Sequence, residues 1–144
     1  MAIQAVLLIA TALAGLTGPA WAGDRRFVSS VLGGLLLVAG AALAIRGAAD
    51  LREGLTPFPR PRDGAPLVQR GAYRLVRHPI YSGIILGAIG WALLSGSLAA
   101  LAGAVALLLL FDLKSRREEA WLAERHPGYE QYRRRVRKLI PGIY

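Results

Sequence analysis

Residues 79–111 read PIYSGIILGAIGWALLSGSLAALAGAVALLLLF and carry no charged side chain. As one straight helix this block would be roughly 50 Å long at ~1.5 Å per residue, which exceeds the ~30 Å hydrocarbon core of a bilayer. Near its middle lies Ser95-Gly96-Ser97, which is a turn signal. We therefore predict two helices, about residues 79–94 and 98–113, folded as a hairpin. Each is short for a full span, which implies a thinned membrane or an incomplete crossing.

A second apolar block, residues 27–45, is long enough to cross the bilayer as a helix. Its glycines at positions 33, 34 and 40 would let another helix approach closely. A composition that simply favours small residues explains these glycines equally well. In either case the block is predicted to be a transmembrane helix.

The N-terminal apolar block, residues 2–22, is also uncharged. Ala20-Trp21-Ala22 fits the small-x-small cleavage pattern of a signal peptide, but nothing basic follows Met1 and the apolar stretch is longer than a typical signal core. We expect a retained helix that bends or ends early, at Gly15, Gly18 and Pro19. Together the three blocks predict an all-α integral membrane protein with about four transmembrane helices, the last two a tight hairpin, plus a cytosolic helical tail.

The composition agrees with this class. Hydrophobic residues make up 54% of the chain and charged residues 19%, whereas soluble domains usually carry about 25% charged residues. The net charge is +9, and the charges flank the apolar blocks, which favours contact with lipid over contact with nucleic acid. The absence of cysteine excludes disulfides, thiolate metal sites and a Cys nucleophile. His78 and His126 lie far apart without flanking ligands, so no metal site is expected.

The two polar segments have different characters. Residues 46–78 contain Pro57-Phe58-Pro59-Arg60-Pro61, which predicts an extended, polyproline-like connector outside the lipid. From Lys114 the tail reads as a charged helix that His126-Pro127-Gly128 breaks. Beyond the break, tyrosines and a valine recur at helical spacing opposite basic residues, as in a helix at the headgroup interface: Tyr129, Tyr132 and Val136.

A first candidate cluster is GAYRLVRHPIYSG, residues 71–83, which places Arg, His and Tyr where a basic loop enters the membrane. Pro79 suits the first turn of the following helix. That helix would offer backbone N–H groups and the positive end of its dipole to an anionic or polar ligand. An ordinary basic segment beside the membrane explains the pattern equally well.

A second candidate cluster is Arg116-Arg117-Glu118-Glu119, just beyond the last apolar block. Carboxylates near a membrane are costly unless they are paired or useful. These two could hold a cationic ligand, an amino group or ribose hydroxyls. The residues alone slightly favour the alternative, an arginine–glutamate salt-bridge cluster at the interface.

Taken together, the two clusters resemble those of a known superfamily. GAYRLVRHPIYSG is followed by a helical hairpin, then by REExxL, then by PGYxxYxxxV. This series resembles the isoprenylcysteine carboxyl methyltransferase and phospholipid methyltransferase superfamily over about residues 65–142. The resemblance implies a helical membrane fold with a cytosolic site for S-adenosylmethionine. It divides the chain into N-terminal helices with the Pro-rich connector, 1–64, and a methyltransferase-like cofactor-binding region, 65–144.

The resemblance also implies site residues. Members with carboxylate substrates carry an Arg just before the Glu run. The nearest positions here are Lys114, Arg116 and Arg117, and the candidate catalytic residues are Arg117 and Lys114. The residues expected to line the cofactor site are Tyr73, Arg77, His78, Pro79, Tyr81, Gly83, Glu118, Glu119 and Tyr129. Methyl transfer from a sulfonium is a direct displacement, so such an enzyme mainly aligns donor and acceptor and excludes water. It needs no metal.

The expected activity is methyl transfer to a lipid-like or membrane-associated carboxylate or amine, in the inner or plasma membrane if the protein is bacterial. Two alternatives stay open. One is a relative of the NADPH-dependent sterol-type membrane reductases, whose 2′-phosphate site the surplus arginines could supply. The other is a non-enzymatic membrane protein that keeps the fold to bind lipid or a partner. Binding of S-adenosylmethionine or NADPH separates the three.

The distribution of basic residues predicts the topology. Residues 46–78 carry seven basic side chains and the tail from Lys114 carries nine, whereas the loop between the first two blocks carries Arg25 and Arg26. The positive-inside rule therefore puts both large basic groups in the cytoplasm. Single cysteines at Gly23, Ala65 and Ala123 should react differently with a membrane-impermeant thiol reagent. In intact cells only position 23 should be labelled, and labelling of 65 and 123 from opposite sides would contradict the hairpin.

Overall fold

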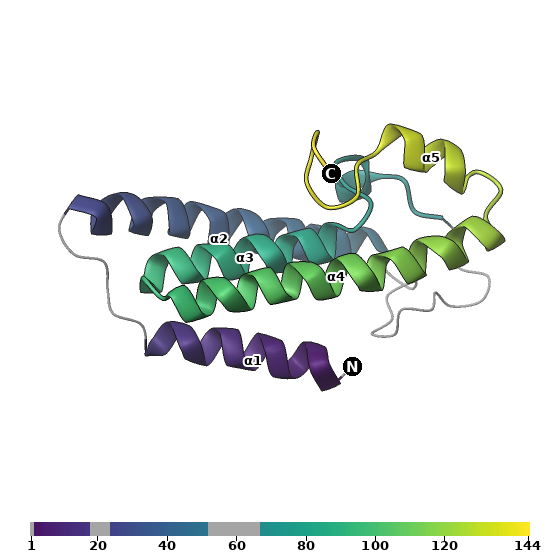
Figure 1. Cartoon of the computed structure of the whole chain (residues 1–144). Helices are drawn as coiled ribbons and strands as arrows, with labels where there is room; N and C mark the ends of the chain where they lie inside the picture. The colour runs from purple at the N-terminus through teal and green to yellow at the C-terminus, as the bar shows by residue number, and fades with distance from the viewer. Residues whose placement is uncertain (1, 18–23, 52–66) are drawn as a thin grey trace. The chain divides into compact units, whose positions relative to one another are not determined.

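The computed structural model describes residues 2–17, 24–51 and 67–144. Regular structure in these residues is helical: α1 (Ala2–Leu16), α2 (Asp24–Leu51), the 3-10 helix η2 (Gly71–Arg74), α3 (Pro79–Ser95), α4 (Leu98–Arg125) and α5 (Tyr129–Arg135) (Figure 1). An isolated parallel bridge joins Val76 to Arg137. The predicted all-α class is confirmed for this part of the chain.

The predicted hairpin is confirmed. α3 ends at Ser95 and α4 begins at Leu98, and Gly96 between them has a φ of +64°, a conformation that glycine adopts without steric cost. The hydroxyl of Ser97 accepts the N–H of Ala100 at 3.1 Å and so caps the new helix. α4 runs on to Arg125 instead of ending near residue 113, because the charged tail continues the same helix.

The N-terminal helices also follow the prediction. α1 passes Gly15 and ends at Leu16, short of Gly18 and Pro19, so the expected early end is found. Its retention in the mature protein stays a prediction. α2 passes the expected end at Ile45 and continues to Leu51. The predicted polyproline-like segment at 57–61 lies outside the described residues.

The chain forms two compact units, and α2, α3 and α4 contribute to both. The first unit comprises Met1–Ala42 and Gly83–Leu110. In it the indole N–H of Trp91 on α3 donates to the carbonyl of Ala12 on α1 at 3.1 Å. The hydroxyl of Ser97, before α4, donates to the carbonyl of Ala14 at 2.8 Å. Polar groups thus join α1 to the hairpin where no lipid would satisfy them.

Apolar side chains cover the outside of the first unit. Large exposed hydrophobic residues line α1, α2 and α4, including Val6, Leu35, Val38 and Val105. Within the described ranges two helices are long and apolar enough to cross a membrane, residues 26–51 and 98–125, while α1 and α3 are shorter. Their length and composition fit a membrane-associated protein, and the predicted four-span topology stays a prediction.

The second unit comprises Leu43–Ser82 and Phe111–Tyr144. In it the carboxylate of Asp50, near the end of α2, accepts the N–H of Ala72 in η2 at 2.8 Å and the Nε–H of Arg46 at 3.2 Å. The hydroxyl of Tyr132 on α5 donates to the carbonyl of Tyr73 at 2.6 Å. These contacts fix η2, which forms the first part of the first candidate cluster.

Close packing of α2 on α3 explains one of the glycines at 33 and 34. A Cβ on Gly33 would lie 2.7 Å from the carbonyl oxygen of Gly90 on α3, whereas a Cβ on Gly34 would meet nothing within 4 Å. We expect Gly33→Ala to cost about 1–3 kcal/mol of stability through overpacking. The neighbouring Gly34→Ala should be neutral or slightly stabilising, because alanine is the better helix former. Equal melting temperatures of the two variants in detergent would contradict this packing.

Candidate functional site

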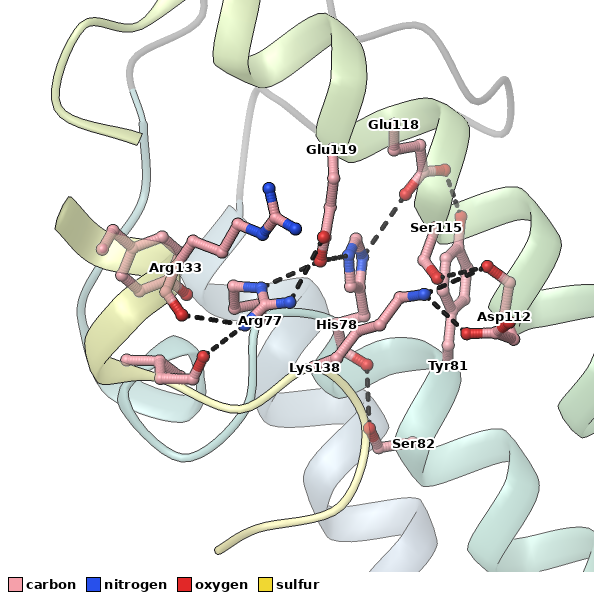
Figure 2. Close-up of polar contacts among 12 residues, drawn as sticks. Arg77, His78, Tyr81, Ser82, Asp112, Ser115, Glu118, Glu119, Arg133 and Lys138 are labelled. Carbon is pink, nitrogen blue, oxygen red and sulfur yellow. Dashed lines mark hydrogen bonds and ion pairs between the residues drawn. The ribbon is translucent and has the colours of Figure 1, made fainter. Parts of the chain in front are cut away.

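Both candidate clusters meet in the second unit. Arg77 and His78 lie in the short segment between η2 and α3, and Glu118 and Glu119 lie on the C-terminal half of α4. The segment before α3 is held by the chain after α5, because the N–H of Arg77 donates to the carbonyl of Arg137 at 2.8 Å and that of His78 donates to Lys138 at 3.2 Å. Figure 2 shows the side chains of the two clusters pointing toward one another.

Arg77 and Glu119 form the centre of the site. The Nε–H of Arg77 donates to one carboxylate oxygen at 2.8 Å, and its Nη2 donates to the other at 3.2 Å. The remaining guanidinium nitrogen donates to the carbonyl oxygens of Arg133 and Val136. Both side chains are close to 10% exposed. A two-pronged pair of this kind fixes orientation as well as charge.

His78 bridges the two glutamates. Its Nε2 lies 3.0 Å from a carboxylate oxygen of Glu119, and its Nδ1 lies 3.4 Å from a carboxylate oxygen of Glu118. The hydroxyl of Tyr81 donates to the other oxygen of Glu118. One imidazole therefore links two neighbouring carboxylates on the same helix turn, and the Tyr81 hydroxyl binds the second of them (Figure 2).

The charges of the two carboxylates act on the cations beside them. Burial lowers the pKa of His78, but its hydrogen bonds to Glu118 and Glu119 and their charges outweigh burial and raise the pKa above its ordinary value. Burial also works against the charge of Arg77, and the hydrogen bond and charge of Glu119 again raise the pKa. The site thus favours the protonated imidazole, which then donates from both ring nitrogens.

An aromatic row lies beside the polar cluster. The rings of His78 and Tyr81 are nearly parallel with centroids 5.6 Å apart, and the rings of Tyr81 and Phe111 stack at 4.6 Å. The ammonium of Lys114, a predicted catalytic residue, lies 5.1 Å from the centroid of Tyr81. The row gives the site a flat apolar side next to its charged groups.

Other predicted site residues have different surroundings. Tyr129 is 1% exposed, and its hydroxyl has no hydrogen-bond partner among the residues that the structure describes. Burial raises the pKa of Tyr129 above its ordinary value, the charge of Glu119 raises it further, and Arg77 opposes both. Tyr73 is buried, and its carbonyl accepts from the hydroxyl of Tyr132. Arg117 is exposed, and no hydrogen bond of the cluster involves it.

Two of the predicted cofactor-site residues, Pro79 and Gly83, pack against α2. Pro79 is fully buried as the first residue of α3, where its missing N–H costs nothing. A Cβ on Gly47 of α2 would come within 2.9 Å of its ring. Gly83 belongs to the first unit, where its carbonyl oxygen faces Gly40 of α2. Their proposed contact with a cofactor stays a prediction.

The alternative of an arginine–glutamate cluster holds in part, because Glu119 forms an ion pair with Arg77, but Arg116, in the same run as the glutamates, has another partner. Arg116 binds Asp112, one turn earlier on α4, at 2.8 Å. Glu118 and Glu119 instead pair with residues about forty positions earlier in the chain. The same run of charges therefore supplies one surface pair and one buried long-range cluster.

Several polar residues of this unit were not among the predicted ones. Asp112 accepts from Lys138 at 2.5 Å and from the hydroxyl of Tyr144 at 2.7 Å. The hydroxyl of Ser82 donates to the carbonyl oxygens of His78 and Leu139. Asp112 could have been noticed as the first charged residue after the long apolar block, since an isolated acid there needs a partner.

Comparison with known proteins places this arrangement in a family. The family model described as phospholipid methyltransferase matches residues 28–127. The cobalt-zinc-cadmium resistance protein CzcN of Cupriavidus metallidurans is 36% identical over 83 residues, which cover 57% of this chain and 38% of that protein. The protein-S-isoprenylcysteine O-methyltransferase of Schizosaccharomyces pombe is 38% identical over 79 residues, 54% of this chain and 34% of that protein. The chain thus spans about a third of the length of these curated relatives. No solved structure matches it significantly.

The family match covers well over half of the chain and contains both clusters that form the site. The resemblance that the two motifs indicate is therefore confirmed. This helical, membrane-associated chain belongs to the phospholipid methyltransferase family.

Proposed function

We propose that the protein is an integral membrane methyltransferase that uses S-adenosylmethionine to methylate a lipid-like or membrane-associated acceptor. The observation that carries the proposal is the buried cluster in which Arg77 and His78 meet Glu118 and Glu119. Membership of a methyltransferase family gives this cluster its chemical meaning. The cofactor-binding region would be residues 65–144, with the site and the tail in the cytosol.

The polar groups of the site fit such a cofactor. S-adenosylmethionine presents an ammonium group, ribose hydroxyls, a carboxylate and a flat adenine. A carboxylate has about four acceptor positions. Glu119 uses three of them for Arg77 and His78, whereas Glu118 uses two for Tyr81 and His78. Glu118 therefore has more capacity left for the donors of a ligand.

Other neighbours of the cluster could complete the contacts. The buried hydroxyl of Tyr129 has no partner among the described residues and could bind a polar group of the ligand. The stacked rings of Tyr81 and Phe111 could accept a flat base on an apolar surface. We infer that Glu119 mainly holds Arg77 and His78 in place, and that Glu118 contacts the cofactor.

The bound cofactor would supply an electrophilic methyl group. The residues of the chain would then bind both partners, orient the acceptor and exclude water. For a carboxylate acceptor no proton needs to move, and Lys114 beside Tyr81 could hold it by charge. For an amine acceptor Glu118 could take the proton. The name of the fission-yeast relative includes O-methyl transfer to isoprenylcysteine, which supports a lipidated carboxylate as one candidate.

Two single substitutions test the division of roles. The wild type should bind S-adenosylhomocysteine and gain about 2.7 kcal/mol of stability at one hundred times its Kd. Glu118→Gln should weaken this binding by about tenfold or more, because a charge-assisted hydrogen bond is lost, and should lower ligand-free stability less than Glu119→Gln, because Glu118 has no arginine partner in the cluster. Glu119→Gln should lower ligand-free stability by about 3–5 kcal/mol, because it breaks a buried ion pair.

The matched control is Glu130→Gln, since Glu130 pairs with Arg133 and Arg134 only at the surface. It should change stability by less than about 1 kcal/mol. Melting curves and isothermal titration in detergent measure both quantities, with NADPH as the comparison ligand. Wild-type affinity in both Glu118→Gln and Glu119→Gln would refute the contact assignment. Binding of NADPH alone would favour the reductase alternative.

A further inference from the structure

The segment after α5, residues 136–144, is called the strap here. It lies against the loop between η2 and α3, residues 75–78, which carries Arg77 and His78. Its carbonyl groups accept from the loop and from α3 in sequence order. Those of Arg137 and Lys138 accept the N–H groups of Arg77 and His78, and that of Leu139 accepts the hydroxyl of Ser82 at 2.7 Å. The backbone position of the strap therefore sets the position of the loop that carries Arg77 and His78.

The strap is itself fastened to α4 by a buried ion pair. The ammonium of Lys138 lies 2.5 Å from a carboxylate oxygen of Asp112 and 3.2 Å from its carbonyl oxygen. The side chains are 8% and 15% exposed. The hydroxyl of Tyr144 donates to the same carboxylate at 2.7 Å. Figure 2 shows Lys138 reaching across from the strap to Asp112.

Lys138 joins these two sets of contacts in a single residue. Its carbonyl accepts the N–H of His78, and its side chain binds α4, the helix that also carries Glu118 and Glu119. Lys138 therefore links the loop that carries His78 to the helix that carries Glu118 and Glu119. An ion pair between elements matters here for geometry more than for net stability.

We propose that Lys138 and Asp112 are positioning residues for the site: their ion pair holds the strap on α4 and so keeps Arg77 and His78 opposite Glu118 and Glu119. The effect on a cofactor rests on the proposed function, whereas the effect on the loop does not. Neither residue needs to touch a ligand.

Arg116 provides a matched control, because it binds the same carboxylate at 2.8 Å but lies one turn further along α4, and its side chain is 66% exposed. Removing Arg116 takes a cation from Asp112 and leaves the Lys138 contact in place, although Arg116 also interacts with the hydroxyl of Tyr144 at the end of the strap. Removing Lys138 takes away the strap contact. A comparison of Lys138→Met with Arg116→Met therefore separates positioning from the general loss of a charge near Asp112.

The experiment is hydrogen exchange of the full-length protein in detergent, read on peptides that cover residues 74–82. Lys138→Met should speed exchange of the Arg77 and His78 amides by about tenfold or more, and Arg116→Met by less than about twofold. Asp112→Asn, nearly isosteric, should behave like Lys138→Met and serves as the second variant if that one folds poorly. The double variant Lys138→Met with Asp112→Asn should exchange no faster than Lys138→Met alone, because both substitutions remove the same contact.

Affinity for S-adenosylhomocysteine is the second readout. Lys138→Met should weaken it about tenfold while Arg116→Met leaves it within about twofold. Unchanged exchange in both Lys138→Met and Asp112→Asn would overturn the proposal. So would faster exchange with wild-type affinity, since the strap would then hold the loop without serving the site. If the wild type does not bind the ligand, the proposed function fails, and the exchange data alone decide whether the ion pair holds the loop.

Discussion

The second unit depends on the pairing of Arg77 with Glu119. Two charges that are each about nine-tenths buried are tolerable only because they meet with good geometry and because Arg77 places its third nitrogen on backbone carbonyls. The pair connects the loop before α3, the C-terminal half of α4 and the end of α5. The pair also brings His78 and Tyr81 close to Glu118, because these residues are near Arg77 and Glu119 in the sequence.

This dependence explains how a short membrane-associated chain can carry a site with few polar residues. The site is built where the charged tail begins, beyond the uncharged block of residues 79–111, so its carboxylates need not lie in hydrocarbon. Methyl transfer asks mainly for alignment and for the exclusion of water. In the proposed function, the buried ion-pair network and the stacked aromatic rings beside it would align the two partners and exclude water.

The sequence predicted the hairpin and the meeting of the two motifs, because an uncharged block with Ser95-Gly96-Ser97 near its middle has to turn back. It did not predict that Glu118 and Glu119 would pair with Arg77 and His78 and not with the adjacent arginines. Local spacing alone slightly favours the adjacent arginines. The Lys138–Asp112 contact was missed because the two residues are 26 positions apart and no periodic pattern links them. Only the packed backbone brings them together.

The most direct test of the account is transfer of a labelled methyl group. The full-length protein, purified in bilayer nanodiscs that contain lipids of its host membrane, would be incubated with methyl-labelled S-adenosylmethionine. Products would then be separated into aqueous and organic phases. The account predicts time-dependent label in the organic phase with the wild type and little with Glu118→Gln. Label that stays entirely on the cofactor, despite binding of S-adenosylhomocysteine to the same preparation, would contradict methyl transfer to a lipid-like acceptor.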